Sequence, residues 1–167
     1  MDAITSLLIV KITLISGLAL WCSIAVINNI TDPKTNVGLV AAMMRMVLIK
    51  QDNETPGGKA LLWRAVDSNW MPVASLVFAI VLQIISSIIL WYADVLLLQQ
   101  IISGGSAEGL SMATSVANIG LSSMLMTWFF FLCGGLWFAY WIKMPQVQQV
   151  HIMLVLISLL SLVVVNL

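Results

Sequence analysis

Four apolar stretches, separated by shorter polar segments, follow one another along this chain. A hydrocarbon core about 30 Å thick is crossed by roughly 20 helical residues. We therefore expect membrane-spanning helices at about residues 4–27, 72–98, 113–141 and 147–167. The second stretch is the clearest, because residues 73–93 contain no charged side chain. The pattern predicts an all-α membrane protein, a bundle of four transmembrane helices that form a single integral membrane domain over residues 1–167.

A polar insert at residues 28–71 separates the first two spans and is long for a structureless connection. Asp32 followed by Pro33 is typical of a helix N-cap and first helical residue. The largely apolar residues 37–49 then predict a helix too short to cross the bilayer, which would lie in the interface or pack across the mouth of the bundle. Residues 59–66 predict a second short helix. The insert is therefore expected to be partly helical.

Charged and aromatic residues near the ends of the spans are expected to anchor the helices at the membrane surface. Tryptophan and tyrosine favour the headgroup level, and a lysine near a helix end extends its ammonium to water. Under this interpretation no charge lies deep in the bundle. The predicted interfacial anchors are Lys11, Trp70, Trp91, Asp94 and Lys143.

Composition supports membrane lipid as the solvent of this chain. Hydrophobic residues make up 61% and charged residues only 8%, and the mean hydropathy is +1.06, whereas a soluble domain carries about a quarter charged residues. The net charge is zero and no basic stripe is present, so we expect no nucleic-acid partner. Cys22 and Cys133 lie in apolar runs and His151 is the single histidine, which predicts no disulfide, no metal and no cofactor.

The sequence holds no recognisable catalytic set. No nucleophile with a neighbouring base, no glycine-rich phosphate loop and no paired carboxylates occur, so we expect no catalytic residues and no enzyme.

Gln83 and Asn118 are mid-span amides, and with nearby serines they predict an intramembrane polar seam. Such residues ordinarily make hydrogen bonds between helices. A water-filled path along the seam is the alternative.

Three further features predict local contacts. Gly135 and Ala139 are four residues apart, a spacing that permits close approach between helices. Arg64 is expected to hold the insert to lipid headgroups or to Asp67. His151, without a carboxylate nearby in sequence, is expected to be structural.

Orientation follows from the basic residues of the loops. The insert holds five of them and Lys143 adds a sixth before the last span, whereas the opposite side has only Lys11. The positive-inside rule then places the insert in the cytoplasm. The five basic residues of the insert are Lys34, Arg45, Lys50, Lys59 and Arg64.

Short motifs in the insert resemble a known family. The run Asn28-Asn29-Ile30-Thr31-Asp32, then Asn36, then Trp63-Arg64-Ala65 is similar to the bacterial "predicted small integral membrane protein" family, a domain of unknown function. The stretch Gly134-Gly135-Leu136-Trp137-Phe138 with Trp141 resembles its last helix but one. The resemblance implies a multi-pass protein of the bacterial inner (cytoplasmic) membrane, and it implies no activity.

The chain departs from the family pattern at two positions. Leu136 stands where the family has an acidic residue, and a second acidic position of the family falls near Gln83. At these two positions the resemblance therefore implies no intramembrane carboxylate in this chain. Family members also have basic residues before the first span, where Lys11 lies. That feature would place the insert in the periplasm, against the loop count, and we slightly prefer it.

Two functions are compatible with this sequence. The first is a non-catalytic membrane protein that binds a partner protein, as an accessory subunit or as an immunity protein against a membrane-acting toxin. The alternative is a small oligomeric channel or transporter with its path along Gln83 and Asn118, and a homo-oligomer is open in either case. The candidates for partner binding are Asn28, Asn29, Thr31, Asp32, Asn36, Arg45, Trp63 and Arg64.

Overall fold

A computed structural model of the chain describes residues 3–52 and 57–167. Four of its helices are long and apolar enough to cross a membrane, which confirms the predicted all-helical class with four candidate spans. They are α1 (Ala3–Thr31), α4 (Trp70–Ser103), α5 (Ala107–Trp137) and α6 (Pro145–Val165).

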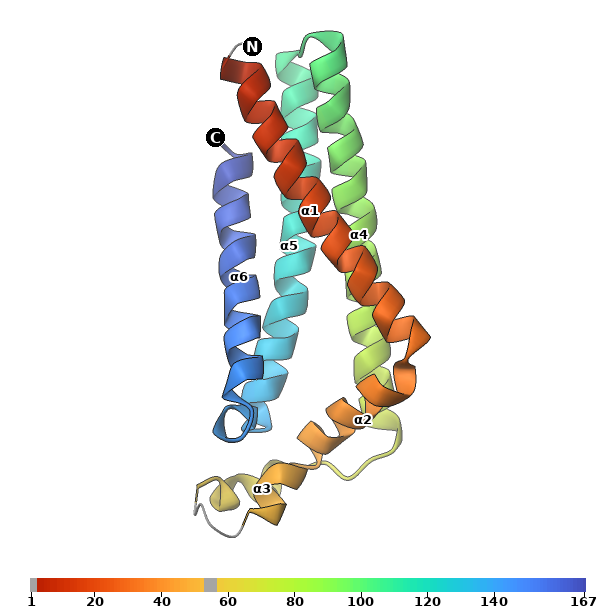
Figure 1. Ribbon diagram of the computed structural model, residues 1–167, viewed down its shortest axis with the longest axis vertical. Helices are drawn as coiled ribbons and strands as arrows, with labels where there is room; N and C mark the ends of the chain where they lie inside the picture. The colour runs from red at the N-terminus through yellow and green to blue at the C-terminus, as the bar shows by residue number, and fades with distance from the viewer. Residues whose placement is uncertain (1–2, 53–56) are drawn as a thin grey trace.

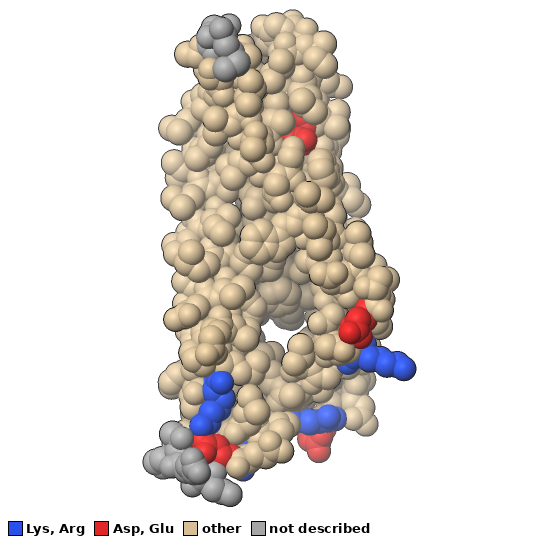
Figure 2. Space-filling view, in the orientation of Figure 1, with Lys and Arg blue, Asp and Glu red and all other residues tan. Residues whose placement is uncertain are grey.

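The four long helices run side by side, and both chain termini lie at the end opposite the insert (Figure 1). α4 packs against α1 on one side and α5 on the other, and α6 packs mainly on α5. Toward the insert the α1–α4 pair and the α5–α6 pair spread apart, and the space-filling view shows an opening between them (Figure 2). The bundle is therefore tightly packed at the end with the termini and splayed at the other.

Regular spacing of apolar side chains explains the core. On α1 the buried apolar positions Leu8, Ile15, Leu18 and Cys22 are three, four or seven residues apart, which places them on one helix face. They pack against Leu90 and other residues of α4 and α5 in one continuous cluster. Many other apolar side chains of these helices are exposed, among them Val77, Ile88 and Leu160, as expected for helices solvated by lipid.

The connection between α4 and α5 is shorter than the sequence suggested. α4 continues to Ser103 and is about 51 Å long at 1.5 Å per residue, longer than the hydrocarbon core. Gly104 ends it with a left-handed φ of 79°, a conformation that glycine adopts without a steric penalty. Ser106 then caps α5 by accepting a hydrogen bond from the N–H of Gly109 at 3.0 Å. A glycine stop followed at once by a serine cap leaves only three residues between the helices.

The insert consists of α2 (Pro33–Met44), α3 (Val47–Gln51) and the 3₁₀ helix η1 (Lys59–Arg64), with residues 53–56 outside the described part. Asp32 caps α2 by accepting a hydrogen bond from the N–H of Thr35. The apolar stretch at 37–49 was expected to be one helix, but it is broken at Met46, whose φ is 51°. The break turns α3 toward the junction of α5 and α6, where Met46 and Ile49 pack on Ala139.

The end of α5 corrects the expectation for Gly135 and Ala139. α5 ends at Trp137, and Ala139 adopts a left-handed φ of 53° before the 3₁₀ helix η2 (Tyr140–Ile142). The ring of Tyr140 then folds back onto Gly135, so a Cβ there would lie only 2.5 Å from the ring. Gly135 makes room for the ring of Tyr140 and not for a second helix. Ala139 lies in the turn between α5 and η2 and does not form a helix–helix contact with Gly135.

Candidate functional site

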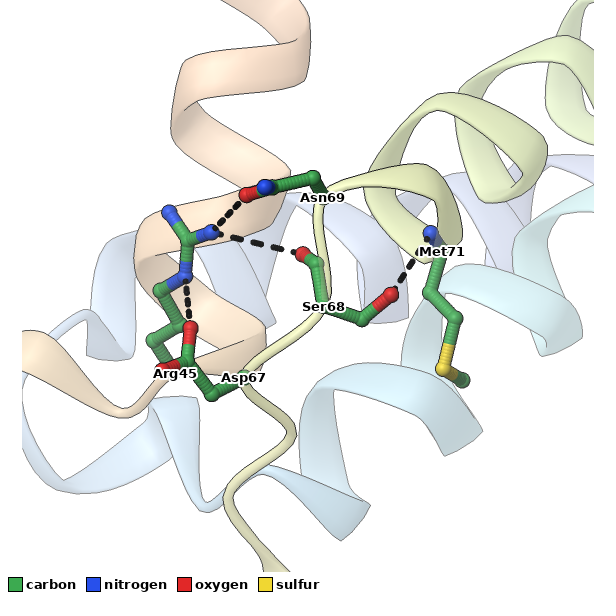
Figure 3. A network of polar contacts seen from close by, with 5 residues as sticks. All are labelled: Arg45, Asp67, Ser68, Asn69 and Met71. Carbon is green, nitrogen blue, oxygen red and sulfur yellow. Dashed lines mark hydrogen bonds and ion pairs between the residues drawn. The ribbon is translucent and has the colours of Figure 1, made fainter.

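Arg45 fastens the insert to the start of α4 (Figure 3). Its Nε donates to Asp67 Oδ1 at 2.9 Å, and its Nη2 donates to Asn69 Oδ1 at 2.8 Å and to the carbonyl of Ser68 at 3.4 Å. Ser68 in turn accepts a hydrogen bond from the N–H of Met71 in the first turn of α4. One guanidinium therefore holds three consecutive residues, which fixes the path of the chain into the span.

Arg64 lies between two tryptophan rings instead of pairing with Asp67. Its guanidinium carbon is 5.3 Å from the ring centre of Trp63 and 5.2 Å from that of Trp137, within range of a cation–π contact. Of the two contacts expected for Arg64, to lipid headgroups or to Asp67, the second is not formed, and Asp67 pairs with Arg45 instead. Through these rings Arg64 joins the insert to the end of α5.

The remaining motif residues lie at the corner between α1 and α2. Asn29 donates to Gln83 Oε1 of α4 at 3.0 Å, and Asn36 donates to the carbonyl of Asp32 at 3.2 Å. Thr31 donates to the carbonyl of Ile27 within α1. Asn28, Thr31 and Asp32 are exposed. Most of these side chains thus shape the corner, and the sequence motif is largely explained by how the insert attaches.

A line of polar contacts follows the packing of α1 on α4. The hydroxyls of Ser23 and Ser87 are 2.7 Å apart, and Trp91 Nε1 donates to Ser23 at 3.1 Å. One heptad away, Ser16 donates to Asp94 Oδ2 at 2.8 Å. Together with the Asn29–Gln83 pair these residues form what we name the α1–α4 polar line.

Asp94 is the main correction to the predicted site. It was expected at the headgroups, but it is 4% exposed and its Oδ1 has no hydrogen bond among the described residues. α4 continues for nine residues beyond it, and α1 covers it. Lys11, expected to extend to the membrane surface, is 9% exposed and occupies the core-facing stripe between Leu8 and Ile15. Two ionisable residues are therefore buried in the bundle, contrary to the expectation that no charge lies deep within it.

Gln83 and Asn118 do not share one seam. Asn118 on α5 exchanges two hydrogen bonds with Asn166, which follows α6, at 3.0 and 2.9 Å. Gln83 faces α1. Each amide pair joins a different pair of helices, which is the ordinary structural use of such side chains.

The other predicted anchors have different surroundings. Trp70 is 70% exposed at the start of α4. Trp91 keeps its ring outside while its N–H is bound within the α1–α4 polar line. Lys143 forms an ion pair with Asp52 and so ties the α5–α6 junction to the end of α3.

Tyr140 and His151 form a second polar contact at that junction. Their rings stack with centres 5.9 Å apart, and the Tyr140 hydroxyl lies 3.2 Å from His151 Nδ1. Burial raises the pKa of the Tyr140 phenol above its ordinary value. His151 also packs on Phe131, with ring centres 5.3 Å apart, so the pair resembles a structural contact more than a catalytic one.

Two hollows mark the surface. A shallow, open groove of about 570 Å³ follows one face of α1, and every residue that lines it belongs to this helix, including Thr13, Leu14, Gly17 and Trp21. A smaller cavity of about 190 Å³ lies between the insert and the α5–α6 junction. Within residues 3–52 and 57–167, no three His, Cys, Asp or Glu side chains lie close enough together to hold a metal ion.

Comparison with known proteins gives one family. No curated protein and no solved structure shows a significant match to the chain. The family described as "Predicted small integral membrane protein (DUF2165)" matches residues 7–167, nearly the whole chain. This range contains the insert, α4, α5 and α6 in full and α1 from residue 7 onward. The chain therefore belongs to this family of predicted small integral membrane proteins.

Proposed function

We propose that this chain is a non-catalytic, multi-pass protein of the bacterial inner membrane that binds another membrane protein through a helix seated in the α1 groove. The observation that carries the proposal is the groove itself. α6 touches α1 at few positions, so one face of α1 remains uncovered by its own bundle. A helix of a partner would complete this side.

The groove has the features of a helix–helix contact in lipid. Thr13 and Gly17 are four residues apart, and a Cβ added at Gly17 would meet no other atom within 4 Å. Small residues at this spacing let a second helix approach closely, and close packing drives association where no hydrophobic effect operates. The Thr13 hydroxyl is already bound to the carbonyl of Ile9, so the partner need not supply a polar group.

A binding role fits the polar groups of the bundle. Among residues 3–52 and 57–167, Ser16–Asp94 and Tyr140–His151 are pairs without the third member of a nucleophilic triad, and they lie in separate parts of the molecule. An accessory subunit or an immunity protein acts by contact or occlusion and needs no such triad. The insert, held in place by Arg45 and Lys143, would add a rigid polar surface beside the membrane.

Co-purification from the native host in a mild detergent tests the proposal. The wild type is expected to bring down a stoichiometric membrane protein, and Gly17→Leu, which fills the groove, is expected to lose it. Gly134→Leu is the matched control, because Gly134 also lies on a transmembrane helix with no atom within 4 Å of an added Cβ. A wild-type chain that extracts alone would contradict the proposal, and a second copy in place of a different protein would indicate a homo-oligomer.

The α1–α4 polar line favours a second candidate, a small channel or transporter. A buried aspartate in a membrane protein is a functional candidate by default. The interface between α1 and α4 holds Asp94 together with Ser16, Ser23 and Gln83. Under this alternative Asp94→Asn or Gln83→Leu would abolish ion flux in liposomes. The absence of ion flux in liposomes that contain the wild-type protein would exclude this alternative.

A further inference from the structure

The insert cavity lies where the insert meets the α5–α6 junction. Its walls are mostly apolar side chains from α2, α3 and the α5–α6 junction, with Tyr140 and Lys143 as the polar members. It is larger than the roughly 150 Å³ that accepts benzene in an engineered protein core. Leu39, one of its walls, is 58% exposed, so the cavity opens to the surroundings of the protein. Six of its lining residues are Leu39, Ala42, Met43, Met46, Ile49 and Phe138.

The chemistry of the walls suits a flexible apolar chain. Methionine side chains are unbranched and adapt to ligands without a fixed shape, and three of them, Met43, Met46 and Met144, line this cavity. Among the described residues that line the cavity, Tyr140 and Lys143 carry the polar side chains, and none carries a side-chain amide or carboxylate. A saturated chain therefore fits better than a polar small molecule.

The position of the cavity indicates a lipid. Trp63, Trp70, Trp137 and Trp141 surround this end of the bundle and are exposed, as tryptophans are at the headgroup level. The cavity residues Phe138 and Ala139 directly follow Trp137, so the hollow lies close to that level and within reach of acyl chains.

Charge favours an anionic headgroup. Six of the seven basic residues of the chain belong to the insert or to the α5–α6 junction, and charged groups gather at this end of the molecule (Figure 2). Lys50 is exposed and directly follows the cavity residue Ile49, while Lys143 lines the cavity and pairs with Asp52. Basic pockets beside membrane helices recognise anionic lipid headgroups.

We propose that the insert cavity binds one acyl chain of an anionic phospholipid, with the headgroup phosphate held at the rim by Lys50. The lipid fills space between the insert and the α5–α6 junction and so stabilises the attachment of the insert. This site is separate from the α1 groove and does not depend on a protein partner.

Thermal unfolding of the delipidated full-length protein in detergent, with and without added lipid, tests the site. The probes are phosphatidylglycerol and phosphatidylcholine with identical acyl chains. Phosphatidylglycerol is expected to raise Tm in a saturable manner and to remain bound as one molecule in native mass spectrometry, whereas phosphatidylcholine binds several-fold more weakly.

Three variants test the geometry. Lys50→Gln is expected to weaken phosphatidylglycerol binding about fivefold, the effect of one basic residue near an anionic surface. Leu39→Trp and Ala42→Leu each place a larger side chain in the cavity, and each is expected to abolish binding. Leu39 is the more exposed of the two, so Leu39→Trp tests the cavity even if Ala42→Leu does not fold. Lys34→Gln is the charge-matched control, because Lys34 lies at the far end of α2 and does not line the cavity.

Three results would overturn the proposal. Equal stabilisation by both lipids would exclude recognition of the anionic headgroup. Undiminished binding by Leu39→Trp would exclude the cavity as the binding site. Loss in Lys34→Gln as large as in Lys50→Gln would indicate diffuse attraction to the basic surface. None of these results depends on whether a protein occupies the α1 groove.

Discussion

The neighbouring glycines near the end of α5 provide a sharp test of how the helix ends are packed. A Cβ at Gly135 would lie 2.5, 2.6 and 2.7 Å from three ring atoms of Tyr140, well inside the 3.5–4.0 Å of an ordinary carbon contact. A Cβ at Gly134 would meet nothing within 4 Å. Tyr140 is 3% exposed and stacked on His151, so its ring cannot simply move aside.

The two alanine variants separate the steric effect from helix propensity. Replacing a helical glycine by alanine stabilises by about 0.5–1 kcal/mol, and this gain is common to both positions. Overpacking a buried site costs about 1–3 kcal/mol, and only Gly135→Ala incurs it. The difference in the free energy of unfolding between Gly134→Ala and Gly135→Ala is therefore expected to be about 1–3 kcal/mol.

Reversible unfolding in mixed micelles with increasing sodium dodecyl sulfate, followed by tryptophan fluorescence, measures this difference. Trp137 and Trp141 flank the Tyr140 turn and report on its displacement. Equal unfolding midpoints for the two variants would refute the packing of Tyr140 on Gly135. Gly135→Ala combined with Tyr140→Leu should recover most of the loss, because the ring that causes the clash is gone.

Further predictions concern the polar contacts. Arg45→Gln is expected to destabilise the attachment of the insert by about 1–2 kcal/mol, seen as faster amide exchange across residues 45–69, and unchanged exchange would contradict the role of Arg45. Ser16→Ala is expected to cost about 1–3 kcal/mol in the wild type, because it leaves the buried Asp94 carboxyl without its hydrogen bond, and much less when Asp94 is already Leu; equal costs in the two backgrounds would exclude the contact. The raised pKa of Tyr140 means that its contribution to stability is complete below about pH 10 and is lost as the pH rises through the higher folded-state value. Tyr140→Phe should therefore show a shallower loss of stability than the wild type above pH 10, and parallel curves would contradict the burial of the phenol.

Most of the fold could be predicted from sequence because hydrocarbon imposes a simple rule on length and polarity. The four spans and the family membership follow from apolar runs and short motifs. The helix ends could not be placed as well, because they depend on local caps. α4 runs past the aromatic pair at Trp91 and stops at Gly104, and the serine cap at Ser106 was not recognised.

The placement of charges was harder to predict for a physical reason. Hydropathy along one helix does not reveal which face another helix covers, so Asp94 looked like a residue at the end of a span. Ser16, 78 positions away in sequence, donates the hydrogen bond that one oxygen of this carboxyl group accepts. The heptad spacing of Ser16 and Ser23, matched by Ser87 and Asp94 on an antiparallel neighbour, was the signal that could have identified this contact.

Orientation is also clearer once Lys11 is located. This residue lies in the core-facing stripe of α1 and is not a flanking loop charge. The remaining basic residues all lie at the insert end, so we now expect the insert in the cytoplasm. Labelling of single cysteines introduced at Lys59 and at Glu108 by a membrane-impermeant reagent tests this, with labelling of intact cells expected only at residue 108.

Site-specific photo-crosslinking in the membrane of the native host tests the central claim most directly. A photoreactive amino acid at Gly17 is expected to give one defined adduct with another membrane protein, while the same amino acid at Gly134 gives lipid adducts alone. Lipid adducts alone at both positions would show that acyl chains occupy the α1 groove, and would contradict a partner helix there.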